Sequence, residues 1–226
     1  MNDTSRMISG PLCLRVWGER ACFTRPEMKV ERVSYDVITP SGARGVLEAV
    51  LWKPQMRWIV ERIDVLKPVR KASVRRNEVG QKASVDNLMA AMTGRSARLG
   101  LDIEEARQQR AAVILRDVDY LIHARISLTV RASLDDSLAK YVEIFHRRAA
   151  SGQCFHRPYL GTREFAAEFA LVETDPPAPI ADTRDLGWML YDIDYSGAKP
   201  IPLFFEARLD AGALAVPEPN SPQLRR

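Results

Sequence analysis

Histidine and arginine are the side chains of this chain best suited to proton transfer and phosphate binding near neutral pH. His123 precedes Arg125 by two positions in the segment VILRDVDYLIHARISLTV, residues 113–130. From Val118 onward, apolar and mostly polar residues alternate, which predicts a strand with one face on a core and one largely polar face. His123 and Arg125 would then be neighbours on the polar face. An imidazole there can move a proton, and a guanidinium can bind a phosphate.

The other two histidines differ in context. His146 falls on the polar side of a predicted helix, and we interpret it as a solvated surface residue. His156 lies in HRPYLGTREF, close to Arg157 and Arg163. An arginine-rich loop at a helix end can bind phosphate, although ordinary turn chemistry explains the same residues.

The densest basic run is PVRKASVRRNEVGQK, residues 68–82. It predicts a hairpin or an exposed arm. Its charge suits contacts with RNA phosphates, and simple solvation is the alternative. The candidate RNA contacts in this run are Arg70, Lys71, Arg75 and Arg76.

Composition narrows the functional classes. The net charge is +4, but residues 173–226 carry nine acidic and five basic residues, so residues 1–172 carry +8. The three cysteines have no metal-ligand spacing, which predicts a reduced protein in the cytoplasm without structural zinc. A P-loop, GxSxG, HExxH or paired-Asp motif is missing from the sequence, so we expect neither a metal nor another cofactor. A secretory signal and a membrane span are not expected either.

The apolar patterns predict the order strand, helix, two strands, helix, strand. Thr39-Pro40 has the features of a helix start and Pro54 stops that helix, while Ser133 or Asp135 can cap the second helix and Gly152 ends it. The strands are expected near residues 12–17, 56–69, 113–130 and 167–173. Residues 83–110 have weak periodicity and are expected to be a mobile insertion.

This order predicts an α+β fold of the ferredoxin-like type, with two helices on one sheet face and the other face free for a ligand. We expect residues 1–172 to form this domain. A small β-rich region over residues 173–226 would follow, after the proline-rich segment DPPAPIADT, and would end in a disordered tail.

Several longer segments carry a family resemblance. The segment FTRPEMKVERVSYDVITPSGARGVLEAVLWKPQMRW, followed by IDVLKPV, LRDVDYLIHARI and FHRPYLGTREFAAEF, resembles the Cas-five family of CRISPR-associated proteins, in the subtype of type I-C systems. The resemblance covers about residues 8–206. It implies a RAMP-superfamily protein with a ferredoxin-like domain and a basic β-hairpin. It also implies a metal-independent endoribonuclease that cuts the repeat of precursor CRISPR RNA and remains in the surveillance complex with other subunits.

The implied chemistry is attack of a ribose 2′-OH on the adjacent phosphate, which needs a base, an acid and a cation. Other members of the family use a Tyr and a Lys–His pair. Here Leu51 occupies the Tyr position before WKP, and the chain contains no Lys–His dipeptide. His123 on the matching strand remains, with Lys53 or Arg125 as the cation. Tyr35 is a replacement phenol or a packing residue.

Two functional hypotheses therefore stand. The first is an RNA-processing endonuclease. The second is a non-catalytic RNA-binding subunit that holds the 5′ handle of the guide RNA, and its support is the incomplete catalytic trio. For both hypotheses, nonspecific binding of duplex DNA is an expected side activity.

Overall fold

The computed structural model describes residues 8–82, 84–95 and 100–226. Parts of the insertion expected over residues 83–110 therefore lie outside the described residues. Within the described part of the chain, no helix is long and apolar enough to cross a membrane.

The architecture is mixed α/β and is built on one eight-stranded sheet. Its main path runs β5-β1-β4-β2-β8-β7-β6, and β3 pairs with β4 off this path. All strand pairs are antiparallel. The strands are β1 (Leu12–Ala21), β2 (Met56–Val65), β3 (Arg70–Val79), β4 (Arg107–Leu128), β5 (Glu168–Leu171), β6 (Arg184–Asp194), β7 (Ile201–Asp210) and β8 (Ala213–Ala215).

Two helices cover the apolar face of this sheet. Helix α1 (Pro40–Val50) begins as predicted, because the Thr39 hydroxyl accepts a hydrogen bond from the Gly42 N–H at 3.1 Å. Helix α4 (Leu138–Ala150) is capped by Ser137 instead of Ser133 or Asp135. Ser133 and Asp136 bond to each other in the preceding turn, so the helix starts later than predicted.

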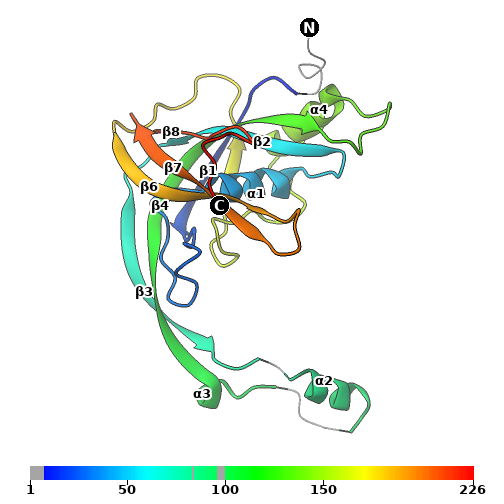
Figure 1. The fold of residues 1–226 in the computed structure, drawn as a ribbon, viewed down its shortest axis with the longest axis vertical. Helices are drawn as coiled ribbons and strands as arrows, with labels where there is room; N and C mark the ends of the chain where they lie inside the picture. The colour runs from blue at the N-terminus through cyan, green and yellow to red at the C-terminus, as the bar shows by residue number, and fades with distance from the viewer. Residues whose placement is uncertain (1–7, 83, 96–99) are drawn as a thin grey trace.

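Strand β4 is 22 residues long and joins two parts of the molecule. Its second half lies between β1 and β2, and Val118, Tyr120, Ile122, Ala124 and Ile126 are buried against the helices, as predicted. Its first half pairs with β3 to form a curved arm that projects from the body (Figure 1). The prediction began this strand at residue 113, because the exposed residues before it carry no apolar pattern.

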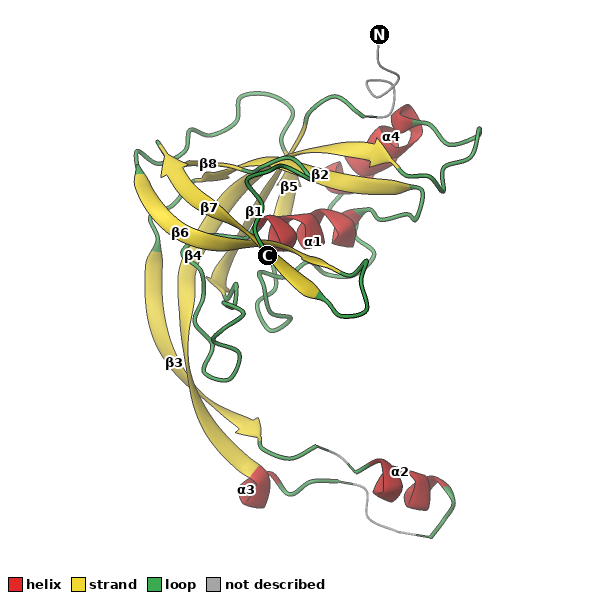
Figure 2. Ribbon diagram, viewed as in Figure 1, coloured by secondary structure: helices red, strands yellow, loops and turns green. Residues whose placement is uncertain are grey.

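The end of the arm carries two short helices, α2 (Val85–Met92) and α3 (Ile103–Ala106). Both lie in the segment expected to be a mobile insertion. The structure thus confirms an arm at residues 68–82 and adds helical segments beyond it (Figure 2).

Strand β2 departs from simple alternation. Alternation alone would place Ile59, Glu61, Ile63 and Val65 on one face. The pairing with β4 shifts between Val60 and Arg62, so a β-bulge at Glu61 turns this carboxylate outward. Val60 is buried before the bulge, and Ile63 after it.

The C-terminal strands continue the same sheet through the β2–β8 pairing and curl over α1 (Figure 2). Met189, Phe205 and Leu214 belong to the same apolar core as Leu14 on β1. The tail that was predicted to be disordered meets β7 at one isolated bridge: the Arg225 N–H donates to the Phe204 carbonyl at 2.9 Å, and the reverse bond measures 2.8 Å.

Candidate active site and nucleic-acid interface

His123 lies on the polar face of β4, and 26% of its side chain is exposed. Its Nε2 lies 2.8 Å from Oδ2 of Asp64, a carboxylate on β2 that is 3% exposed. Arg62 binds the same carboxylate through two hydrogen bonds of 2.6 and 3.0 Å. The side chain of His123 is thus held in one orientation by a buried anion.

This arrangement sets the protonation state of the pair. Hydrogen bonds from His123 to Asp64 and Cys13 raise the pKa of His123 to about 9, against the opposing effect of burial. Burial alone would raise the pKa of Asp64, but its bonds with His123 and Arg62 make the net shift downward. At neutral pH, His123 is therefore an imidazolium that can donate a proton and cannot accept one.

His123 shares a pocket with a second histidine, His146. His123 and Cys13 line a pocket of about 350 Å³ together with His146 on α4 and Pro176 after β5. The His146 Nδ1 lies 3.3 Å from a carboxylate oxygen of Glu173, which also lines the pocket. The sequence predicted a solvated surface residue at His146, and 38% of its side chain is exposed. No local signal indicated that it also lines this pocket, because the pocket forms only when α4 and the chain after β5 meet at the edge of β1.

The polar sheet face is less open than predicted. Arg125 pairs with Glu61 at 2.8 Å, and Arg15 pairs with Asp119 at 2.7 Å. Leu121, which lies in register between Arg15 and Asp64, is only 1% exposed. Most charges on this face are satisfied inside the protein, so the face is a network of ion pairs rather than a free cationic surface.

Lys53, another predicted site residue, does not lie beside His123. The register places Met56, three residues after Lys53, opposite Leu128. Leu128 is five residues along β4 from His123, which corresponds to about 16 Å. Lys53 is exposed in the loop after α1 and therefore cannot be the cation beside His123.

Tyr35 lies in the core and is 1% exposed. Its hydroxyl accepts a hydrogen bond from the Leu190 N–H at 3.2 Å, and the Arg25 guanidinium lies over its ring at 4.4 Å from the centroid. Burial raises the pKa of Tyr35. This burial favours the packing role of Tyr35 over that of a replacement phenol.

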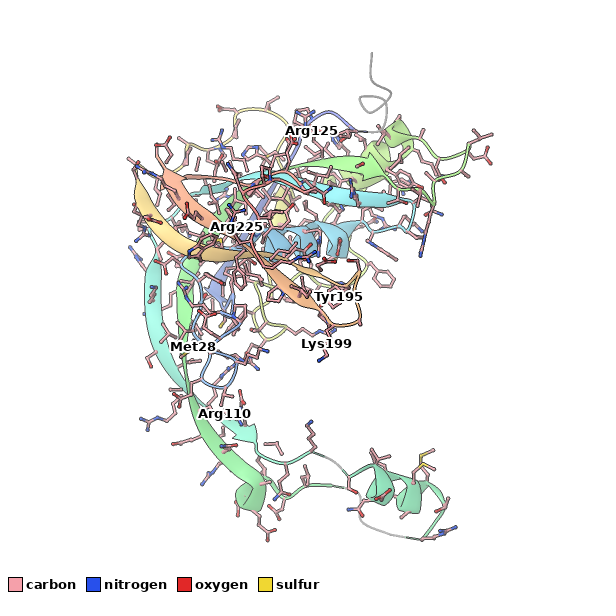
Figure 3. The ribbon with its side chains drawn as sticks, in the orientation of Figure 1. Met28, Arg110, Arg125, Tyr195, Lys199 and Arg225 are labelled. Atoms are coloured by element: carbon pink, nitrogen blue, oxygen red, sulfur yellow. The ribbon has the colours of Figure 1, made fainter. Side chains whose placement is uncertain are left out.

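The basic residues of the arm lie on opposite faces of β3. Lys71 and Arg75 share one face, whereas Arg70 and Arg76 share the other. Lys71 pairs with Asp36 at 2.7 Å, and Arg76 pairs with Glu164. Arg70 approaches Asp117 at 3.9 Å, and Arg75 is exposed without an ion pair in the described ranges. One strand of RNA along one face cannot contact all four. Figure 3 labels Arg110 on the arm, far from Arg125 on the body.

The loop after α4 contains the last two predicted contacts. Arg157 pairs with Glu168 on β5. Arg163 is exposed and has no ion pair among the residues that the structure describes. Among those residues there is also no group of three or more His, Cys, Asp or Glu side chains that could hold a metal ion.

Comparisons with known proteins agree with this architecture. Residues 11–217 match the model of the CRISPR-associated protein family Cas5, in its Cas5d form, so the chain belongs to this family. A relative from Mannheimia succiniciproducens is 50% identical over 220 residues, covering 94% of this chain and 97% of the relative. One from Thermus thermophilus is 41% identical over 236 residues, covering 95% of each. Both carry the name CRISPR pre-crRNA endoribonuclease Cas5d.

Two solved structures share the fold. The crystal structure of a CRISPR-associated protein aligns with a TM-score of 0.69 at 22% identity, covering 97% of this chain and 99% of the other. That of a functionally uncharacterized protein from Streptococcus mutans aligns with a TM-score of 0.68 at 20% identity, covering 97% and 98%.

Proposed function

We propose that this chain is a metal-independent endoribonuclease that cuts precursor CRISPR RNA within the repeat and then remains as a subunit of the type I-C surveillance complex. The observation that carries this proposal is the pair of relatives named as pre-crRNA endoribonucleases, at 50% and 41% identity over nearly the whole chain. Its partners are the repeat RNA and the other subunits of that complex. Duplex DNA is a nonspecific ligand, and the cytoplasm is the location.

We assign the chemistry to the pocket that contains the two histidines. The ribose 2′-oxygen attacks the adjacent phosphorus, the bond to the 5′-oxygen breaks, and the products are a 2′,3′-cyclic phosphate and a 5′-OH. His123, protonated at neutral pH, donates a proton to the leaving 5′-oxygen. His146 faces the same pocket and accepts the proton of the 2′-OH. Arg125 lies two residues from His123 on the same strand face, and it contributes positive charge near the phosphate when its ion pair with Glu61 opens.

The strand order supports a ferredoxin-like N-terminal domain. The order β5-β1-β4-β2, with α1 between β1 and β2 and α4 between β4 and β5, is that of a split βαβ fold. The arm is then an extension of the central hairpin. We propose residues 1–172 as this domain and residues 173–226 as a β-rich region that extends its sheet.

The test is incubation of the purified protein with its cognate repeat RNA in EDTA. Cleavage should persist, and a 2′-deoxy substitution at the cut position should abolish it. His123→Ala and His146→Ala should each slow cleavage by about 10²-fold, the usual scale for losing a general acid or base. Cleavage that stops in EDTA and returns with a divalent ion contradicts the metal-independent mechanism.

The second candidate is a non-catalytic subunit that binds the 5′ handle. It is favoured by one observation, namely that Lys53 and Tyr35 do not assemble a trio with His123. Under this alternative the wild-type protein binds repeat RNA tightly and leaves it intact. If the RNA is cut but a folded His123→Ala variant cuts it at the wild-type rate, the enzyme proposal stands and the histidine pocket is not its active site.

A further inference from the structure

Two large aromatic side chains are exposed on neighbouring loops. Trp52 follows α1 and is 56% exposed, and Phe155 follows α4 and is 85% exposed. The Phe155 N–H donates to the Ala49 carbonyl at 2.8 Å, and the Arg148 guanidinium donates to the Val50 carbonyl at 2.9 Å. These bonds hold the loop after α4 against the end of α1.

Further rings follow Phe155. His156 packs edge to face against Phe155, with ring centroids 6.1 Å apart. His156 also stacks on Tyr159, with centroids 6.3 Å apart and ring planes inclined by 26°. Phe155 therefore begins a row of three rings at the surface.

The two chain segments that carry these rings contain only basic charged residues. Residues 51–57 and 144–163 contain six Lys and Arg residues and no Asp or Glu, whereas the whole chain has a net charge of only +4. Lys53 and Arg147 are exposed and have no ion pair within the described ranges. Carboxylates approach from neighbouring elements at two points: Glu168 pairs with Arg157, and Glu173 pairs with His146.

Exposed aromatic rings beside cations, of which Lys53 and Arg147 have no ion pair in the described ranges, fit one ligand chemistry better than others. Single-stranded nucleic acid offers free base faces for stacking, together with phosphates for the cations. In a duplex the base faces are stacked on one another. A protein partner would match the aromatic groups, but it would also need a strongly acidic surface to match the cations.

We propose that this aromatic–basic surface, made of Trp52, Lys53, Phe155, His156 and Arg157, binds single-stranded RNA. Bases stack on Trp52 and Phe155, and phosphates contact the cations of the same two loops. The inference rests on the proposed function in one respect, that RNA is the ligand of this protein.

The surface also continues toward the arm. The loop after Tyr159 leads to Arg163 and then to Glu164, which accepts hydrogen bonds from Arg76 on β3 and from Arg32. Arg75, the exposed cation at the neighbouring position of β3, lies on the opposite face of that strand. An RNA strand leaving the aromatic–basic surface along this loop therefore reaches the base of the arm.

Binding can be measured without cleavage. The probe is an unstructured, fluorescently labelled 2′-O-methyl oligoribonucleotide, which lacks the 2′-OH nucleophile, and the readout is fluorescence anisotropy. Trp52→Ala and Phe155→Ala should each weaken binding by about 30-fold, the middle of the range for losing one stacked base. Phe155→Trp should retain wild-type affinity, because the stacking ring is kept.

Trp188→Ala is the matched control, since Trp188 is also half exposed, at 49%, but lies on β6, where it lines a different pocket together with Tyr35 and Phe204. It should bind like the wild type. Affinity for a duplex of the same sequence should not change in the Trp52 and Phe155 variants. Wild-type affinity of both variants for the single strand overturns the proposal, as does an equal loss in the Trp188 control.

The two proposals fail separately. If the wild type binds the probe through Trp52 and Phe155 but never cuts repeat RNA, only the enzyme assignment fails. If it cuts repeat RNA while both variants bind the probe normally, only the aromatic–basic surface fails.

Discussion

Raising the pH from 6 to 9.5 should destabilise the protein through His123. An imidazole in an unfolded chain has a pKa near 6.5, whereas in the fold Asp64 and Cys13 raise that of His123 to about 9. The folded state therefore binds this proton more tightly than the unfolded state does. The stabilisation is complete below about pH 6.5 and is lost as the pH rises through about 9.

The size of this loss in the free energy of unfolding follows from the difference between the folded and unfolded pKa values of His123. Each tenfold difference in proton affinity is worth about 1.4 kcal/mol, so the upper bound is about 3 kcal/mol. Because a quarter of the His123 side chain is exposed, solvent screening lowers the expected value to about 2 kcal/mol. The downward shift of Asp64 adds stability that is lost only at acidic pH, below about 4.

The assay is urea unfolding under reducing conditions at both pH values, in parallel for the wild type and Asp64→Asn. The free energy of unfolding should fall by about 2 kcal/mol more in the wild type than in the variant. An NMR titration of the three histidines gives the pKa directly. A His123 pKa at or below 6.5 refutes both the stabilising pair and the role of His123 as a proton donor at neutral pH.

Three further predictions concern the arm and the backbone. Arg75→Ala should lower the slope of the logarithm of the RNA-binding constant against the logarithm of the salt concentration by about 0.7. Adding Lys71→Ala should bring the total decrease to about 1.4 if both side chains contact phosphates. An unchanged slope in filter-binding titrations shows that this face does not hold RNA. Arg76→Ala should instead lower the melting temperature of the free protein, because it removes the pairing with Glu164 and Glu78; a calorimetric scan identical to that of the wild type contradicts this. Gly161→Ala should lower the free energy of unfolding by about 2 kcal/mol or more, because its φ is +85° and a Cβ would lie 2.1 Å from the Cys22 carbonyl oxygen. Gly152→Ala, at φ +67° with open space around it, should lower it by about 1 kcal/mol in the same urea unfolding experiment.

Local patterns in the sequence were enough to locate most of the body of the fold. The alternation from Val118 to Ile126 identified the central strand and its buried face, because side chains on a strand point to opposite sides with a period of two. Thr39-Pro40 identified the start of α1, because capping depends on residues within one turn of each other. The position of the arm followed from a basic run that has no apolar face to bury.

The same local patterns misplaced features that depend on contacts between distant residues. Glu61 interrupted the predicted inner face of β2, and only the pairing with β4 introduces the bulge that turns it outward. The C-terminal tail has the composition of a disordered segment, yet the free edge of β7 at Phe204 provides hydrogen-bond partners for Arg225.

The candidate site, too, was predicted in part from local sequence patterns and in part depends on tertiary contacts. The residue types and their alternation were sufficient to place His123 and Arg125 on one polar strand face. Strand register decided that His123 meets Asp64, that Arg125 meets Glu61, and that Lys53 lies too far away to assist. These contacts join residues tens of positions apart in the chain, so their geometry depends on how strands and helices pack. The arrival of His146 at the same pocket as His123 was decided only by that packing.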